Sequence, residues 1–431
     1  MHEAVSRGVG ANYPTESNLA LHYAESGRRP VREKMDAMRL EPKLSSRTAW
    51  DIAETELAIA IRARREAGLP LINLTASNPT QCGLSYDESA ILPALIDPRA
   101  MQYDPDPRGM LFARQAVARY YSDRGVRTEA NRIFLTTSTS EAYSYLFRLL
   151  ADPGDEVLIA QPSYPLFDFL AQLEDVRLVN YPLFYDHGWH LDLEALRQRI
   201  GPRTRAIALV HPNNPTGHFT KTAERRALED LCTEHGLALI VDEVFLDYDL
   251  DGENQESFAA GEHPALTFVL SGLSKVAALP QMKVAWIAAF GPDSTLYGAL
   301  NRLEIIADTF LAMNAPIQCA LPTWLAGRSA IQRQIRSRLL ENLAALDASL
   351  TVQTMVTRLE VEAGWYAVLR VPALMPDEEL ATRLVREYGV SLHPGSSFGF
   401  SESGWLVLSL LPPPTEFLYG IRILTSAFQE K

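Results

Sequence analysis

The 431-residue sequence predicts an α/β protein with a large domain and a smaller α+β domain. Three observations predict this class. Short continuous apolar runs recur through the middle of the chain, helical stretches separate several of them, and the pattern changes after about residue 320. Apolar runs of this kind are typical of a mainly parallel sheet, here of the seven-stranded type, with helices on both faces.

The apolar runs of the middle region are the predicted strands of the large domain. They are continuous rather than alternating, as expected for strands buried on both faces. A helical stretch, KTAERRALEDLCTEHG (221–236), separates two of them. The runs are NRIFLTT (131–137), DEVLIAQP (155–162), RAIALVHP (205–212), LALIVDEVF (237–245), TFVLSGLS (267–274) and VAWIAAF (284–290). Ligands of such sheets bind beyond the carboxyl ends of the strands.

The two ends of the chain predict the remaining parts. Residues 1–45 are polar and are expected to form an arm, either loose or packed on a partner subunit. The stretch 45–68 has a Ser/Thr-rich start, helical apolar spacing and a Gly stop, and it leads into LPLINLTASNP (69–79). A charged helix over 329–350 precedes short strands around 361–372 and 404–414. We therefore assign 46–95 and 321–431 to the small domain and 96–320 to the large, cofactor-binding domain.

Composition excludes several classes of function. Forty basic against 53 acidic residues give a net charge of −13, which argues against nucleic acid or an anionic membrane as partner. No run of 18 apolar residues is present, and the N-terminus has no apolar signal region, so a cytoplasmic protein is expected. The three cysteines are far apart and without ligand spacing, so no metal site is expected.

Three polar side chains follow successive apolar strands. Asn214 lies in HPNNPTG, Asp242 ends the run LALIV, and Lys275 ends SGLSK; the three are 28 and 33 residues apart, about one βα unit each. Each also has a structural interpretation, as a turn residue, a helix cap or a surface lysine. A buried acid needs a cation or donors, and a desolvated lysine is a nucleophile. Together they predict an amide, an acid and an amine at one sheet edge.

With these motifs the sequence resembles the class I/II aminotransferases of pyridoxal-phosphate fold type I, from about Ser46 to the C-terminus. The resemblance implies that pyridoxal 5'-phosphate is bound as a Schiff base to Lys275, which also moves the substrate proton. It implies that Asp242 keeps the ring nitrogen protonated, so that the ring is an electron sink. It further implies that Asn214 donates to the ring oxygen and that Tyr164, in QPSYP, stacks on the ring.

The resemblance also implies a phosphate site. The hydroxyls of TTSTSEAYSYLF open a predicted helix, where N–H groups and the helix dipole favour an anion. A Ser or Thr at this place is equally a good N-cap, and the two roles are compatible. The family has a cationic residue, usually arginine, eight residues after the lysine, and in this sequence it is Lys283. A lysine binds phosphate as a point charge, whereas an arginine binds it through two parallel N–H groups. The implied phosphate ligands are Ser138, Thr139, Ser140, Ser274 and Lys283.

Further residues are implied to reach the substrate or the partner subunit. Tyr103, in YDPDPRG, matches a tyrosine that relatives supply to the cofactor from the other subunit, which implies a homodimer with shared active sites. Ser77 and Asn78, in TASNPT, match a motif whose neighbourhood contacts the substrate carboxylate. The implied partners are a small-molecule amino donor and an oxo-acid acceptor.

Three positions depart from the family pattern. Phe245 stands where the family often has a tyrosine whose hydroxyl donates to the ring oxygen. The absence of this hydroxyl is predicted to raise the pKa of the Schiff base. Ser77 replaces a glycine. Val407, in GWLVLSLL, replaces the arginine that clamps the substrate carboxylate, while Arg422 lies on the following helix and is expected to be structural.

Three functions remain open at this stage. The first is a transaminase acting through Lys275. The second is a lyase, decarboxylase or cyclising enzyme on the same scaffold, which the absent arginine keeps in consideration. The third is a protein that binds pyridoxal phosphate without turnover.

Overall fold

A computed structural model describes residues 43–103, 105–252, 256–351 and 355–429. Its main sheet has eight strands, and all six predicted strands belong to it. The hairpin β4–β5, which was not predicted, forms one edge of the sheet. Its strand β4 includes exposed residues together with Asn180 and Pro182, so its sequence lacks a continuous apolar run. In spatial order the strands are β2 (Ile133–Thr136), β9 (Ala285–Phe290), β8 (Thr267–Gly272), β7 (Ala238–Asp242), β6 (Thr204–Val210), β3 (Glu156–Gln161), β4 (Arg177–Tyr185) and β5 (Trp189–Leu191).

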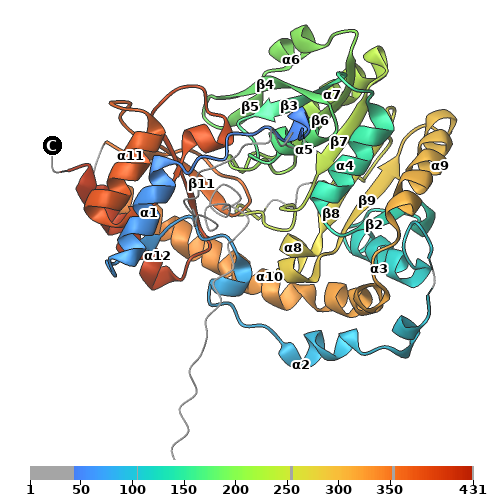
Figure 1. Ribbon diagram of the computed structural model, residues 1–431, viewed down its shortest axis with the longest axis horizontal. Helices are drawn as coiled ribbons and strands as arrows, with labels where there is room; N and C mark the ends of the chain where they lie inside the picture. Colours follow the sequence, from blue (N-terminus) through green and yellow to red (C-terminus); the bar gives the residue numbers. More distant parts are fainter. Residues whose placement is uncertain (1–42, 104, 253–255, 352–354, 430–431) are drawn as a thin grey trace, which may run out of the picture.

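Six of these strands run in one direction, and β9 and β5 run against them. Successive strand residues enter different cores: Ile207 packs on one face of the sheet and Ala208 on the other. The helices that cover the Ala208 face are α4 (Thr139–Leu150), α5 (Phe167–Leu173) and α9 (Asp293–Phe310). The helices over the Ile207 face are α3 (Leu111–Ser122), α6 (Leu193–Arg199) and α7 (Thr222–His235) (Figure 1). Burial on both faces explains why these strands have apolar side chains throughout.

The small domain combines the N-terminal segment with the last third of the chain. Its antiparallel sheet contains, in order, β10 (Thr357–Arg358), β11 (Tyr366–Arg370), β14 (Trp405–Ser409) and β13 (His393–Pro394). The strand β1 (Ile72–Asn73) pairs in parallel with β12 (Val390–Ser391). The helices are α1 (Glu56–Glu66), α11 (Asp377–Arg383) and α12 (Pro414–Ala427), and two further short helices of the chain are α2 (Glu88–Ile91) and α8 (Leu273–Val276).

The N-terminal helix begins later than the pattern predicts. Thr55 caps α1, because its side chain accepts from the Ala58 N–H at 3.2 Å. Before it, the Trp50 indole donates to Gln172 and packs edge-on against Phe169 of α5 at 5.1 Å between ring centroids. This contact holds the preceding residues on the large domain. Residues 1–42 of the predicted arm lie outside the described residues.

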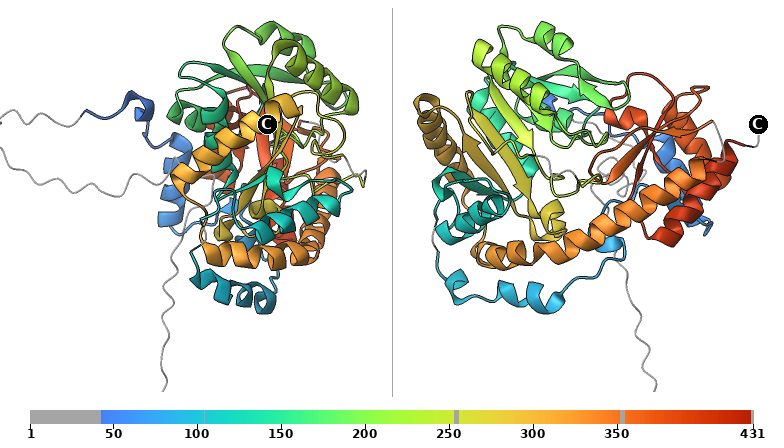
Figure 2. Two further views of the ribbon diagram at one scale, coloured as in Figure 1. Left: turned by 90° about the vertical axis from the view of Figure 1, so that its right-hand side faces the viewer. Right: turned by 180° about the vertical axis from the view of Figure 1, so that it is seen from behind.

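The helix α10 (Ala315–Leu350) connects the two parts of the molecule, and it begins 14 residues before the predicted start at Ser329. Its first turns pack on α3 and its last turns on α12 (Figures 1 and 2). Near its end, the Asn342 amide donates to the carbonyls of Leu410 and Pro412, both at 2.8 Å. The predicted division at residues 320 and 321 therefore falls within one continuous helix.

Candidate active site

The predicted polar residues are brought to one edge of the large sheet. The strands β6, β7 and β8 are parallel neighbours, so their carboxyl ends coincide. Asp242 is the last residue of β7 and lies opposite Val210 of β6 and Leu270 of β8. Lys275 lies in α8, which directly follows β8. The sheet register therefore explains why residues far apart in sequence converge.

The Asp242 carboxylate is buried, with 6% of the residue exposed. Burial raises its pKa to about 7, although the Val244 N–H, the nearby Tyr143 hydroxyl and the positive charge of Lys275 all favour the ionised form. The Val244 N–H donates to Oδ1 at 3.1 Å. Within the described part of the chain, Asp242 forms no ion pair within 4 Å. A cation held against this carboxylate would therefore stabilise its charged form.

Lys275 is half-buried between aromatic rings. Its Nζ lies 5.0 Å from the Trp365 ring centroid and 5.7 Å from that of Phe245. The backbone around it is fixed by side chains: the Tyr248 hydroxyl donates to the Lys275 carbonyl at 2.6 Å, and the Gln332 amide donates to the Val276 carbonyl at 2.8 Å. The amine is thus held at a defined place in an aromatic surrounding.

The two asparagines of the HPNNPTG turn have different roles. Asn213 builds the turn, because its Oδ1 accepts from the N–H and hydroxyl of Thr216. Asn214 is 8% exposed, and its buried Oδ1 has no hydrogen-bond partner in the described structure. Gly217 closes the turn with φ +72°, and a Cβ there would lie 2.4 Å from the Ala363 carbonyl oxygen. The turn interpretation therefore applies to Asn213, while the oxygen of the Asn214 amide is left for a donor outside the described residues.

The residues expected to hold the phosphate lie where β2, β8 and β9 meet. Ala285, at the start of the antiparallel β9, lies opposite both Thr136 and Gly272. Lys283, two residues earlier, is therefore at the edge between the ends of β2 and β8, and its side chain is exposed. Ser138 caps α4 by accepting from the Glu141 N–H at 3.1 Å. Capping and the expected phosphate contact use the same helix N-terminus.

The other predicted residues around that edge are half-buried. They are Thr139 and Ser140 in the first turn of α4, Ser274 in α8, and Tyr164, which packs edge-on against Phe167 at 6.0 Å. These positions offer hydroxyls and an aromatic face along the same sheet edge.

The remaining predicted residues lie in the segment that links the domains. The Asn78 side chain caps a short 3₁₀ turn by accepting from the Thr80 N–H at 3.1 Å. Ser77 beside it is half-buried. Tyr103 is 83% exposed, so this chain alone does not enclose it.

Sequence reasoning missed three aromatic residues of this region. Trp365 borders the Lys275 amine, Tyr248 binds the Lys275 carbonyl, and Tyr143 of α4 is near Asp242. Tyr143 is 2% exposed, and its hydroxyl makes no regular hydrogen bond with the described residues. The motif TTSTSEAYSYLF contained Tyr143, but only the sheet and helix packing places it beside Asp242.

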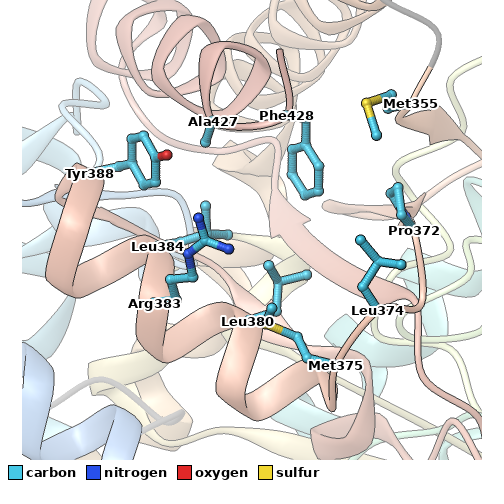
Figure 3. A pocket seen from close by; sticks show the side chains of 10 residues that line it. All are labelled: Met355, Pro372, Leu374, Met375, Leu380, Arg383, Leu384, Tyr388, Ala427 and Phe428. Atoms are coloured by element: carbon cyan, nitrogen blue, oxygen red, sulfur yellow. The ribbon is translucent and has the colours of Figure 1, made fainter. Parts of the chain in front are cut away.

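A pocket in the small domain is too small to be the substrate site. Figure 3 shows it between α11, α12 and the segment before α11; its volume is about 30 Å³, enough for about one water molecule. Its ten lining residues include none of the predicted site residues, and all but Arg383 and Tyr388 are apolar.

The residues at the sheet edge fit pyridoxal phosphate. Asp242 is a buried carboxylate that forms no ion pair within 4 Å, Asn214 has an unpartnered side-chain amide, and Lys275 is an amine whose charge reaches Asp242 and which lies beside aromatic rings. The hydroxyls at the start of α4 suit its phosphate. Among the described residues there is no cluster of side chains that could hold a metal ion.

Comparison with known proteins agrees with this chemistry. Residues 70–417 match the family described as aminotransferase class I and II. The glutamate-pyruvate aminotransferase AlaA of Haemophilus influenzae is 26% identical over 87% of this chain and 95% of its own length. The alanine aminotransferase of Mycobacterium bovis is 29% identical over 81% of this chain and 84% of its own.

Solved structures share the fold. An aminotransferase from Escherichia coli superposes with a TM-score of 0.81 at 25% identity, covering 90% of this chain and 99% of that one. The alanine aminotransferase of Pyrococcus furiosus gives 0.82 at 23% identity, with 90% and 100% covered. The chain therefore belongs to the class I and II aminotransferases, pyridoxal-phosphate-dependent enzymes that move an amino group between an amino donor and an oxo acid.

Proposed function

We propose that Lys275 is the residue through which this transamination proceeds. Its amine would hold the cofactor covalently, and its Nζ would take the proton from the substrate carbon and return it. The cofactor, when bound, supplies an electron sink for the bonds of that carbon. The aromatic surrounding of Nζ, with Trp365 at 5.0 Å, supports this role, because exclusion of water makes a lysine amine more nucleophilic.

Asp242 is the observation that carries this proposal. A buried carboxylate whose pKa is raised to about 7 by burial is an unfavourable structural element unless a cation lies against it. A protonated ring nitrogen would be that cation, and Asp242 would hold the proton on it. Asn214 would donate to the ring oxygen with its amide, and Tyr164 would lie on the ring face.

The phosphate would be held where α4 begins and β8 ends. Its ligands would be hydroxyls and first-turn N–H groups, together with the Lys283 ammonium at the start of β9. The hydroxyls belong to Ser138, Thr139, Ser140 and Ser274.

We further propose pyruvate as the acceptor. Relatives named glutamate-pyruvate aminotransferase and arginine–pyruvate transaminase have pyruvate in common. Ser77 and Asn78 would lie near its carboxylate, as the resemblance implies, and Val407, which is fully buried, would offer it no charge.

A homodimer is proposed from the exposed segment that precedes α3. Four apolar residues within twelve positions are between 53% and 89% exposed, which is unusual for a free surface. A second copy covering this segment would bring Tyr103 to the cofactor of the neighbouring subunit. The exposed residues are Leu92, Ile96, Met101 and Tyr103.

A cytoplasmic location with reduced thiols is proposed from the cysteines. Cys82, Cys232 and Cys319 are all free and buried. No helix among the described residues is long and apolar enough to cross a membrane. The proposed domains remain those of the sequence assignment, 46–95 with 321–431 and 96–320.

The test uses the purified holoenzyme and its cofactor absorption band. Addition of L-alanine should change the band, pyruvate should restore it, and Lys275→Ala should abolish both changes. Lys43→Ala, at an exposed position outside the site, should retain them. A Lys275→Ala variant that still transfers the amino group would refute the assignment. Release of carbon dioxide or another substrate fragment would favour a lyase, and a band unmoved by every donor would favour a protein that only binds the cofactor.

A further inference from the structure

The helix that carries Lys275 is too short to fix its own conformation. The helix α8 is a single turn of four residues, and helices this short are not stable on their own in water. Its last carbonyls also lack partners within the helix, as at every helix end. Side chains from elsewhere in the chain therefore have to hold this turn and the amine that it presents.

Three side chains from different parts of the chain donate to carbonyls of this turn. Tyr248, which follows β7, binds the carbonyl of the lysine itself, and Gln332 of α10 binds that of the next residue. The third donor is Tyr86, from the segment between β1 and α2, and its hydroxyl donates to the Ala278 carbonyl at 2.9 Å. Burial raises the pKa of the Tyr86 phenol, so the phenol remains a protonated donor at neutral and mildly alkaline pH. Tyrosines therefore hold both ends of the turn.

Ala278 has a backbone conformation that alanine rarely adopts. Its φ is +54°, in the left-handed region, where the Cβ lies close to the following carbonyl oxygen. Glycine enters this region without that penalty. The chain turns back at Ala278, since the N–H of Leu279 donates to the Leu273 carbonyl at 3.0 Å. Such strain persists only where the surroundings over-determine it, and the Tyr86 hydroxyl is one of the groups that do so.

Packing alone does not fix this side of the turn. Ala277 and Leu279 line a cavity of about 390 Å³ between the turn, α10 and residues 85–91. Side chains beside a cavity lose the dispersion contacts that packed neighbours would provide. The hydrogen bond from Tyr86, which lines the same cavity, is therefore expected to contribute more to the position of the turn than it would in a packed core.

We propose that Tyr86 is a positioning residue for Lys275. Its hydroxyl holds Ala278 in the left-handed conformation, and this conformation sets where the lysine amine, three residues earlier in the same turn, lies at the sheet edge. Without the hydroxyl, Ala278 relaxes toward negative φ in a larger fraction of the molecules, and only the remaining fraction presents the amine to the cofactor. The inference rests on the proposed function of Lys275 and adds to it the contact that places the amine.

The first measurement is the affinity of the cofactor-free protein for pyridoxal phosphate at pH 8, followed by the cofactor absorption band. Tyr86→Phe keeps the ring and should weaken binding about fivefold, the factor that corresponds to one neutral hydrogen bond. The rate constant for conversion of the holoenzyme at saturating L-alanine should fall as well, because the amine that moves the proton is less often in place. Tyr185→Phe is the matched control: it also removes a tyrosine hydroxyl that binds the backbone, at the N–H of Glu360, but in the hairpin β4–β5, and it should keep wild-type values.

A second background tests the route through Ala278. In Ala278→Gly, where φ +54° costs the residue little, removing the Tyr86 hydroxyl should weaken cofactor binding by less than about twofold relative to Ala278→Gly alone. Equal losses in both backgrounds would overturn the inference, and so would a Tyr86→Phe protein that differs from wild type only in its urea midpoint. Amino transfer by Lys275→Ala would refute the proposed function itself. An inactive Lys275→Ala beside an unaffected Tyr86→Phe would overturn only the role of Tyr86.

Discussion

The Tyr143 hydroxyl is expected to lower the pKa of Asp242, and removing it should shift the pH dependence of cofactor binding. Tyr143 is fixed by aromatic packing, with ring centroids 4.9 Å from Phe167 and 5.9 Å from Phe147. Its buried hydroxyl has no other described partner, yet it lowers the pKa of the nearby Asp242 carboxyl. Replacing Tyr143 by Phe keeps the ring and removes only this donor.

The size of the shift in the pKa of Asp242 follows from the strength of the one donor that is removed. Hydrogen bonds to charged groups contribute about 1.5–3 kcal/mol. Because the Tyr143 hydroxyl makes no regular hydrogen bond, we take about 1.4 kcal/mol, which raises the pKa of Asp242 by about one pH unit. From a value of about 7 in the cofactor-free protein, the ionised fraction at pH 7 falls from about one half to about one tenth. At pH 9 the two proteins should differ by only about 10%.

The assay is the affinity of the cofactor-free protein for pyridoxal phosphate between pH 5.5 and 9.5, followed by the cofactor absorption band. Tyr143→Phe should bind about fivefold more weakly than wild type at pH 7, where binding must first ionise Asp242, and nearly equally at pH 9. Tyr145→Phe is the matched control, because it removes a hydroxyl from the same helix and its ring packs on Phe310. Parallel profiles, with the same fractional loss at every pH, would refute the reasoning and leave Tyr143 a purely structural residue.

Three further predictions concern single positions. Glu362→Gln should lower the unfolding free energy by about 1–3 kcal/mol at pH 7, because His218 and Lys221 lower the pKa of the Glu362 carboxyl from 4.5 to about 2 against the opposing effect of burial. In urea titrations the difference in unfolding free energy between variant and wild type should shrink as the pH falls from 4.5 toward 2. A difference that stays constant over this range would contradict the prediction. Gly217→Ala should lower the unfolding free energy by more than about 2 kcal/mol in the same titration, because the added Cβ would meet the Ala363 carbonyl oxygen. Gly236→Ala has a similar φ but open space around the added Cβ, and it should lower the unfolding free energy by about 1 kcal/mol. Equal losses in the two variants would refute the steric argument. Phe245→Tyr should lower the pH at which the cofactor band changes, since the added hydroxyl favours the ionised ring oxygen, and a spectral titration with identical midpoints would exclude this.

The core strands could be predicted from sequence because burial on both faces leaves a strong local signal. Ile207 and Ala208 face different helix layers, and both must be apolar. The hairpin β4–β5 gave no such signal, since residues such as Phe184 are exposed at the sheet edge. The start of α10 was also missed, because Pro322 and Gly327 are poor helix formers and tertiary packing overrides their propensity.

Predicting the site depended on a different kind of information. Asn214, Asp242 and Lys275 follow strands directly, so the parallel order of β6, β7 and β8 was sufficient to bring them together. Trp365 comes from another domain, 90 residues after Lys275 in the chain, and no local pattern relates the two. Its position depends on how the small domain packs, which the periodicity of a sequence does not contain.

That packing is itself fixed by a short chain of hydrogen bonds to the lysine. Glu362 accepts from the Leu250 N–H through its carbonyl and from the Phe219 N–H through its carboxylate. Two residues later the Gly364 N–H donates to the Tyr248 carbonyl, and the Tyr248 hydroxyl donates to the Lys275 carbonyl at 2.6 Å. Tyr248 thus binds both the segment that leads into β11 and the backbone of Lys275. Because this link spans both domains, the distance between the Lys275 amine and the Trp365 ring is set by the same contacts that join the domains. Variants that remove this link are therefore expected to change the packing of the domains and the position of Lys275 together.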